Sequence, residues 1–384
     1  MSQVSLPRGF RATGVTAGLK PSGAPDLALV VNDGPDHHAA AVFTTNRVEA
    51  APVTWSRQVV SDRRVDAVVL NSGGANACTG AQGFADTHRT AEQVARLLDV
   101  SAGDVVVCST GLIGELLPMD KVLAGIGRAV TELSAQGHAS AATAIRTTDT
   151  VSKEAAHAGE GWSLAGMAKG AGMLAPALAT MLVVLTTDAV VEPDDLGAAL
   201  RAATAVSFDR IDSDACMSTN DTVVVLASGA SGVPVPRGPL TAALTDVCTD
   251  LARQLIADAE GATHDIAIEV RSAATEEEAL EVARAIARNA LFKCAIFGND
   301  PNWGRVLAAV GTTRAAFDPA RLDVTMNGVQ VCRRGGVGDD RSLVDLRPRE
   351  VHVVVDLHAG AAAATIWTND LTHDYVHENS AYST

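Results

Sequence analysis

Thr180 stands where the segment KGAGMLAPALAT runs directly into the apolar stretch MLVVLTT. In an intact chain, a threonine here is a β-branched residue at the start of a strand. If the Ala179–Thr180 peptide were cut, the new α-amino group, with an ordinary pKa of about 7.7–8.0, would lie beside the Thr180 hydroxyl. Such an amine can accept the hydroxyl proton as a general base and turn the threonine into a nucleophile. The residues alone leave both interpretations open.

The same segment also matches a loose nucleotide-binding pattern, because residues 170–175, GAGMLA, fit GxGxxG/A. That pattern requires a helix to begin at the loop, and Pro176 would break such a helix. The order Lys169-Gly170 also reverses the ending of a phosphate-binding loop. A nucleotide site is therefore the weaker interpretation, and a bendable backbone before a rigid strand is the stronger one.

A second stretch suited to acyl chemistry is STGLIG, which follows the apolar run DVVVC. A strand that ends in a turn can direct one hydroxyl and one exposed N–H at a developing oxyanion. The alternative is an ordinary junction in which Ser109 or Thr110 caps a helix over IGELLPMDK. The pattern alone does not decide between them.

Short runs of β-branched and aliphatic residues supply the strands that would position these groups. The predicted strands are residues 27–32, 39–45, 66–72, 104–110, 181–189, 221–229, 265–270 and 350–357. Helices are predicted over 240–261 and 275–292, and Asn327-Gly328 predicts a hairpin turn. Strict strand–helix alternation is absent. We therefore expect an α+β fold, or a layered αββα arrangement, with a smaller lobe from about residue 262 onward.

Composition limits the classes of partner. Lysine and arginine number 30 against 45 aspartate and glutamate, a formal charge of −15 that repels nucleic acids and anionic membranes. The first residues contain no signal-like apolar segment, and no run approaches the roughly 20 residues of a spanning helix, so a cytoplasmic protein is expected. The six cysteines lack CxxC spacing and are expected to be reduced core residues: Cys78, Cys108, Cys216, Cys248, Cys294 and Cys332.

The segment around Thr180, KGAGMLAPALATML (169–182), closely resembles the cleavage and nucleophile segment of the ornithine acetyltransferases of arginine biosynthesis. Eight further blocks resemble the same family and follow its order along essentially the whole chain. They are RGFRATGVTAGLK (8–20), LNSGGANACTG (70–80), STGLIGELLPMDK (109–121), TTDT (147–150), STNDT (218–222), DAEGAT (258–263), GNDPNWGR (298–305) and ENSAYST (378–384). Ordered blocks of this number are far more specific than any single motif.

The resemblance implies an acetyl transfer from N-acetylornithine to glutamate through an acetyl-threonine. It implies self-cleavage at Ala179–Thr180 into an α chain, 1–179, and a β chain, 180–384, a boundary that is not a domain boundary. It further implies an αββα sandwich of the N-terminal-nucleophile-like type and an α₂β₂ heterotetramer. No metal and no organic cofactor is implied.

Site residues carry over from the family position by position. Thr180 would be the nucleophile, with Thr110 and Gly111 as the oxyanion hole. The expected substrate contacts are Thr147, Lys169, Thr180, Glu260, Asn379 and Thr384. As a hypothesis, Lys169 faces the substrate carboxylate and Glu260 the side-chain ammonium of ornithine. Motif matching does not separate Thr147 from Thr148.

Two alternatives stay open within this resemblance. Part of the family also makes N-acetylglutamate from acetyl-CoA, and nothing in the sequence decides whether coenzyme A binds. A self-processing amidohydrolase would use the same nucleophile and oxyanion hole but pass the acyl group to water. Retention of the acceptor-site residues Lys169, Glu260, Asn379 and Thr384 favours transfer. An uncut nucleotide-binding protein is the rival from a different class.

Overall fold

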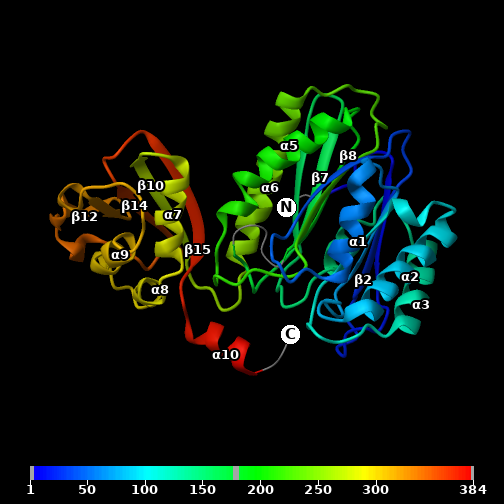
Figure 1. The fold of residues 1–384 in the computed structure, drawn as a ribbon, viewed down its shortest axis with the longest axis horizontal. Helices are drawn as coiled ribbons and strands as arrows, with labels where there is room; N and C mark the ends of the chain where they lie inside the picture. Colours follow the sequence, from blue (N-terminus) through cyan, green and yellow to red (C-terminus); the bar gives the residue numbers. More distant parts are fainter. Residues whose placement is uncertain (1–3, 176–180, 382–384) are drawn as a thin grey trace. The chain divides into compact units, whose positions relative to one another are not determined.

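The computed structural model describes residues 4–175 and 181–381. The chain divides into two compact units (Figure 1). The larger unit comprises the residues up to Asp209 together with Cys216–Leu255, and the smaller unit comprises Arg210–Ala215 together with the residues from Ile256 onward. Ala179, Thr180 and Thr384, which carry three of the predicted roles, lie outside the described residues.

Two β-sheets form the larger unit. The first has the order β1-β2-β4-β5 and the second the order β3-β9-β8-β7-β6. The strands of the first sheet are β1 (Phe10–Val15), β2 (Leu27–Asn32), β4 (Ala67–Asn71) and β5 (Val105–Ser109). Those of the second are β3 (His38–Phe43), β6 (Lys153–Ala158), β7 (Ser163–Lys169), β8 (Leu182–Thr187) and β9 (Thr222–Ala227). Strand pairs are antiparallel except for β4–β5 and β8–β9, which are parallel.

The two sheets pack face to face, because one face of each contributes to the same core. Val30 and Val68 of the first sheet lie in one buried cluster with Met167, Val184 and Val224 of the second. Alternate residues of a strand point to opposite faces, so each sheet also has an outer face that must be covered.

Helices cover both outer faces. α2 (Gly80–Leu98) and α3 (Met119–Thr131) pack on the first sheet, where Val94 and Ile126 share a core with Leu29. α5 (Pro193–Ala205) and α6 (Arg237–Ala257) lie beside the second sheet (Figure 1). The approach of α6 is close, since a Cβ added at Gly166 of β7 would lie 3.0 Å from Leu251. This αββα layering confirms the predicted α+β fold.

The edge strand β5 is covered by α1 (Ala51–Val59). The Trp55 indole donates to the Val105 carbonyl at 3.0 Å. The Ser56 hydroxyl donates to the Val107 carbonyl at 2.8 Å and accepts from the Val107 amide at 3.0 Å. These bonds satisfy backbone groups that an edge strand would otherwise expose, and they hold the strand that leads to Thr110. A further short helix, α4 (His138–Ala144), contributes to the core between the sheets.

The smaller unit has one sheet of order β13-β12-β11-β14-β10-β15. Its strands are β10 (Asp265–Ala273), β11 (Asp323–Met326), β12 (Val329–Arg333), β13 (Gly336–Val337), β14 (Glu350–Asp356) and β15 (Ala362–Asn369). Its helices are α7 (Glu276–Ala287), α8 (Ala290–Phe297), α9 (Trp303–Val310) and α10 (His373–Ala381). In β10, Ile266 and Ile268 are buried in the unit's single core while Ala267 and Glu269 between and after them are only partly buried. That alternation is typical of a sheet with one face packed on helices.

All eight predicted strands are confirmed, and so are the helix over 240–261 and the Asn327-Gly328 turn between β11 and β12. At that turn the φ angles of both residues are positive, 43° and 85°, as a tight hairpin of this kind requires. The single helix over 275–292 is wrong, because the Asn289 side chain accepts from the Phe292 amide at 3.0 Å and starts α8 as a separate helix. Five of the described strands were not predicted: β1, β6, β7, β13 and β15.

The cysteine prediction is only half right. Cys108, Cys248 and Cys332 are buried, whereas the other three are exposed: Cys78, Cys216 and Cys294. All six are free cysteines rather than disulfide partners, as expected. Across residues 4–175 and 181–381, no helix is both long and apolar enough to cross a membrane.

Five short 3₁₀ segments complete the described elements: Val60–Asp62, Ala102–Asp104, Phe208–Arg210, Pro319–Arg321 and Arg341–Leu343.

Candidate active site

Two predicted site residues meet in the larger unit. Lys169 ends β7, Thr110 follows β5, and the Lys169 Nζ donates to the Thr110 Oγ1 at 3.1 Å although the residues are 59 positions apart. Both are buried, with 1 % and 2 % of their surfaces exposed. A hydroxyl that accepts from an ammonium still has its own hydrogen to donate. The pair therefore has the polarity needed to stabilise a negatively charged oxygen.

Gly111 continues the chain away from Thr110 in a conformation that only glycine adopts easily, with φ of 131°. A Cβ at this position would lie 2.9 Å from the Gly74 nitrogen, so the backbone could not stay where it is with any side chain. The Thr110 amide donates to the Asn71 carbonyl at 3.0 Å, which ties the turn to β4. The alternative of a helix cap at Ser109 or Thr110 is wrong, because the next helix begins only at Met119.

Two asparagines hold this turn in place, and neither was predicted. Asn220, from the STNDT block, donates from its side chain to the Ala75 carbonyl at 2.6 Å and the Ser109 carbonyl at 2.9 Å. Asn71 donates to the Ser109 hydroxyl at 2.6 Å. Both side chains are buried, and they donate to oxygens of β5 and of the turn after β4. The only signal for them in the sequence is that they lie in blocks shared with the family.

Asp149 is the carboxylate at the centre of this network and was also not predicted. Its Oδ1 accepts from the Gly170 amide at 2.7 Å and from the Lys153 Nζ at 2.6 Å, and its Oδ2 accepts from the Thr147 amide at 2.9 Å. Burial by itself would raise the pKa of Asp149. The charges of Lys169 and Lys153 and the bound amide outweigh that effect and lower the pKa to about 2. Asp149 is thus an anion at neutral pH, and it fixes the backbone on both sides of the site.

Thr147 is brought to the same network as Lys169, but only through its backbone. Asp149 holds the Thr147 amide, and the same carboxylate holds the amide of Gly170, the residue after Lys169. Three segments distant in sequence, around residues 110, 147 and 169, are therefore connected by hydrogen bonds. This contact does not distinguish the side chain of Thr147 from that of Thr148 as the substrate contact.

Residues 170–175, the glycine loop, form bends that end in a bridge between Leu174 and Met217. No helix begins among them, so the nucleotide-binding interpretation lacks the element that it requires. The first described residue after the predicted nucleophile is Met181. Its amide donates to the Asp221 Oδ1 at 3.0 Å. A buried acid thus holds the backbone next to position 180.

In the smaller unit, two other predicted substrate contacts meet. The Asn379 Nδ2 on α10 donates to the Glu260 Oε2 at 2.9 Å. Glu260 also lines a cavity of about 130 Å³ together with charged side chains and Tyr375. The charged residues of that lining are Asp214, Glu260, Arg288, Lys293 and Asp370. This mixture of signs suits a zwitterionic ligand.

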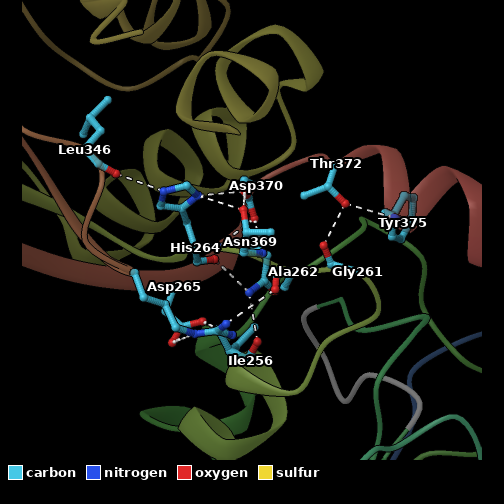
Figure 2. Close-up of polar contacts among 12 residues, drawn as sticks. Ile256, Gly261, Ala262, His264, Asp265, Leu346, Asn369, Asp370, Thr372 and Tyr375 are labelled. Carbon is cyan, nitrogen blue, oxygen red and sulfur yellow. Dashed lines mark hydrogen bonds and ion pairs between the residues drawn. The ribbon is translucent and has the colours of Figure 1, made fainter. Parts of the chain in front are cut away.

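Figure 2 shows polar contacts between the segment that follows Glu260 and the residues that lead from β15 into α10. Asp370, just after β15, accepts from the His264 Nδ1 at 2.8 Å and from the His264 amide at 2.9 Å. The His264 Nε2 reaches the Leu346 carbonyl at 2.9 Å. Closer to α10, the Thr372 hydroxyl donates to the Gly261 carbonyl at 2.7 Å and accepts from the Tyr375 amide at 3.0 Å. The segment carrying Glu260 is therefore bound directly to the start of the helix carrying Asn379.

Lys293 is a buried cation in the same cavity that the sequence did not indicate. Its Nζ donates to the Ser213 carbonyl and to the Thr368 Oγ1, the latter at 3.3 Å. Burial lowers the pKa of Lys293, and the negative charges of Asp214, Asp212 and Asp370 oppose that shift. Since Lys293 reads as an ordinary helix residue in the sequence, only the fold shows that it is enclosed.

The fold and these contacts define an α+β enzyme of the layered αββα class, with a buried lysine–hydroxyl–carboxylate site. The chain matches the ArgJ family over residues 11–384 and belongs to that family. This confirms the resemblance drawn from the sequence blocks.

Curated relatives support the same membership over the full length. The chain is 65 % identical over 381 residues to the Arginine biosynthesis bifunctional protein ArgJ of Thermobifida fusca, covering 99 % of this chain and 100 % of the relative. It is equally 65 % identical over 380 residues to the protein of the same name in Streptomyces coelicolor, with 99 % of each covered.

A solved chain is also similar. The ornithine acetyltransferase of Mycobacterium tuberculosis, whose structure was determined in complex with ornithine, is 57 % identical, and the match covers 46 % of this chain and 94 % of that chain with a TM-score of 0.44.

Proposed function

We propose that this chain is an ornithine acetyltransferase of arginine biosynthesis, which transfers the acetyl group of N-acetylornithine to glutamate through an acetyl-threonine at Thr180. The observation that carries the proposal is the buried hydrogen bond from Lys169 to Thr110. It supports an oxyanion site at the residues that the family resemblance selects. The names of the relatives, which assign them to arginine biosynthesis, agree with this activity.

The proposed nucleophile arises by self-cleavage between Ala179 and Thr180, which leaves an α chain, 1–179, and a β chain, 180–384. The Thr180 α-amine takes the proton of its own hydroxyl as that oxygen attacks the acetyl carbonyl of N-acetylornithine. The Thr110 hydroxyl and the Gly111 amide stabilise the oxyanion of the tetrahedral intermediate. Ornithine leaves with a proton, and the glutamate amine then attacks the acetyl-threonine in the reverse sequence.

Substrate binding is proposed to use Thr147, Lys169 and Thr180 with Glu260, Asn379 and Thr384. Lys169 supplies positive charge toward a substrate carboxylate, and its bond to Thr110 couples that binding to the oxyanion site. Glu260, already hydrogen-bonded to Asn379, supplies negative charge for the side-chain ammonium of ornithine. Glu260→Gln should therefore raise KM for N-acetylornithine, and unchanged kinetics would refute this assignment.

A second activity is favoured by the word bifunctional in the names of the relatives. We propose testing synthesis of N-acetylglutamate from acetyl-CoA and glutamate, with N-acetylornithine absent. Hydrolysis is tested by the converse assay: if N-acetylornithine is consumed equally fast with and without glutamate, the chain is an amidohydrolase. A cytoplasmic location and an α₂β₂ heterotetramer complete the proposal.

Intact mass of the purified protein is the most direct test. Two fragments that meet at Ala179/Thr180 support the proposal, and a single stable chain of 39.5 kDa contradicts it. Thr180→Ala should remain uncut and inactive. Thr186→Ala is the matched control, since Thr186 is a buried threonine on the same side of the junction and should not affect cutting.

A further inference from the structure

Asp221 has a fully buried carboxyl group in which only one of the two oxygens has a hydrogen-bond partner among the described residues. None of its surface is exposed. Its Oδ1 accepts the Met181 amide, but no residue in the described part of the chain hydrogen-bonds to its Oδ2. A buried polar atom without a partner costs free energy, so such a group calls for a functional explanation.

A hydrogen bond holds the Asp221 carboxyl group next to Met181, the residue after position 180. Thr180 and Met181 are joined by a peptide bond, so the nitrogen that cleavage would release belongs to the residue directly before Met181. Because the Asp221 Oδ1 accepts the Met181 amide at 3.0 Å, the carboxyl group is hydrogen-bonded to the residue that directly follows Thr180 in the sequence.

Few charges act on this carboxyl group. Burial raises the pKa of Asp221 well above its ordinary value, and the Met181 amide, the Ser218 hydroxyl and the charge of Lys169 on β7 only partly oppose it. From β5, the Cys108 thiol adds no charge, because burial raises its pKa to about 12. Among the described residues no lysine or arginine forms an ion pair with Asp221, and burial favours the protonated carboxyl group in the uncut chain.

We propose that Asp221 is the buried counter-ion of the Thr180 α-amino group that self-cleavage creates. This inference rests on the proposed cleavage at Ala179–Thr180. On cleavage, the Asp221 Oδ2–H bond gives its proton to the Thr180 nitrogen, so that a neutral acid and a neutral amine become a carboxylate and an ammonium. The proton transfer from Asp221 to the new amine needs no other reactant, although the peptide cleavage that precedes it consumes one water molecule.

The consequence is control of the catalytic base. A carboxylate close to an ammonium favours the protonated amine and raises its pKa, typically by one unit or more. Asp221 is thus a positioning residue that sets the pH at which Thr180 becomes active. Asp221→Asn keeps a carbonyl oxygen for the Met181 amide but removes the charge, so it separates the electrostatic role from the backbone contact.

The experiment compares wild-type protein, Asp221→Asn and Asp86→Asn. Asp86 is another buried carboxylate of the larger unit, on α2, and serves as the control. Intact mass first establishes cutting in each protein. The pH profile of kcat/KM with N-acetylornithine and glutamate then gives the midpoint of the acidic limb. We expect that midpoint to fall by about one pH unit in Asp221→Asn and to stay at the wild-type value in Asp86→Asn.

A second measurement, made on the wild-type protein, tests the proposal even if Asp221→Asn does not fold or is not cut. Reductive ¹³C-methylation of the wild-type β-chain α-amine, followed by NMR titration, should give a pKa above the ordinary range of about 7.7–8.0. A wild-type amine within or below that range, or an acidic limb unmoved by Asp221→Asn, overturns the counter-ion role while leaving cleavage intact. An uncut wild-type protein overturns the proposed cleavage itself and the role of Asp221 with it.

Discussion

Asp149→Asn is the perturbation whose size follows most directly from the structure. The wild-type carboxylate binds two backbone amides and the Lys153 ammonium, and its pKa is lowered to about 2 from an ordinary 3.8. A shift of this size corresponds to about 2 kcal/mol of stability. Since the folded-state pKa is the lower one, that contribution is complete above the ordinary pKa and is lost as the pH falls toward 2.

The pH window of this effect can be calculated. The linkage relation predicts that about 1 kcal/mol of the Asp149 contribution has disappeared by pH 3, and almost none by pH 5. In Asp149→Asn the carboxylate is absent at every pH. Its Lys153 and Lys169 partners lose a buried counter-charge, so the variant should be less stable near pH 7 by about 3–5 kcal/mol.

The assay is urea unfolding of wild type and Asp149→Asn at intervals between pH 7 and pH 3. The difference between them should shrink by about 1 kcal/mol over that range, mostly below pH 4. Asp345→Asn is the matched control, because the pKa of Asp345 is also lowered to about 2 but its carboxyl group is exposed beside Arg347. Solvent screens that pair, and the control should resemble wild type. A constant difference between wild type and Asp149→Asn at all pH values would refute the reasoning.

Three further predictions concern the same unit. Lys169→Met removes the donor to Thr110 and should lower kcat about 10²-fold in a steady-state assay with N-acetylornithine and glutamate, while Lys121→Met, at an exposed lysine of α3, should not. Gly111→Ala forces the backbone away from Gly74, so kcat should fall while the variant still folds by circular dichroism; wild-type kcat would contradict the geometry. Burial lowers the pKa of His138 to about 4, which outweighs the Gly166 backbone and the Glu154 Oε2 at 3.4 Å from the His138 Nε2. Neutral His138 contributes fully to the free energy of unfolding above its ordinary pKa of 6.5, because the folded-state pKa is the lower one. The free energy of unfolding, measured with urea, should therefore fall by about 2 kcal/mol between pH 7 and pH 5, and His138→Gln should abolish that fall.

Strands with continuous apolar runs could be predicted from their own residues. β2, β5, β8 and β9 are continuous apolar runs, because both faces of each are covered, and their boundaries agree with the prediction to within two residues. β7, with the sequence SLAGMAK, was missed because its glycine and alanines have low strand propensity. A side chain at Gly166 would meet Leu185 of the neighbouring strand β8 and Leu251 of α6, contacts that the local sequence does not reveal.

The candidate site could be predicted only in part, for a related reason. Lys169, Thr110, Glu260 and Asn379 were selected by family blocks, and the structure brings them together as two separate pairs. Nothing local marks the groups that hold them. Asp149 reads as a polar loop residue in TTDT, and its function in the network depends on partners from β6 and β7.

Charge distribution connects these observations. The chain carries a formal charge of −15, yet the buried network around Asp149 contains Lys153 and Lys169 against one carboxylate. The nearby Lys20 adds a further cation, whose pKa is lowered to about 8 by burial and by Lys169 while Asp26 opposes the shift. An enclosed site with excess positive charge favours anionic ligands and developing negative charge, whatever the sign of the protein surface. A carboxylate substrate and a tetrahedral oxyanion both have that charge, so binding and catalysis place the same electrostatic demand on this cluster.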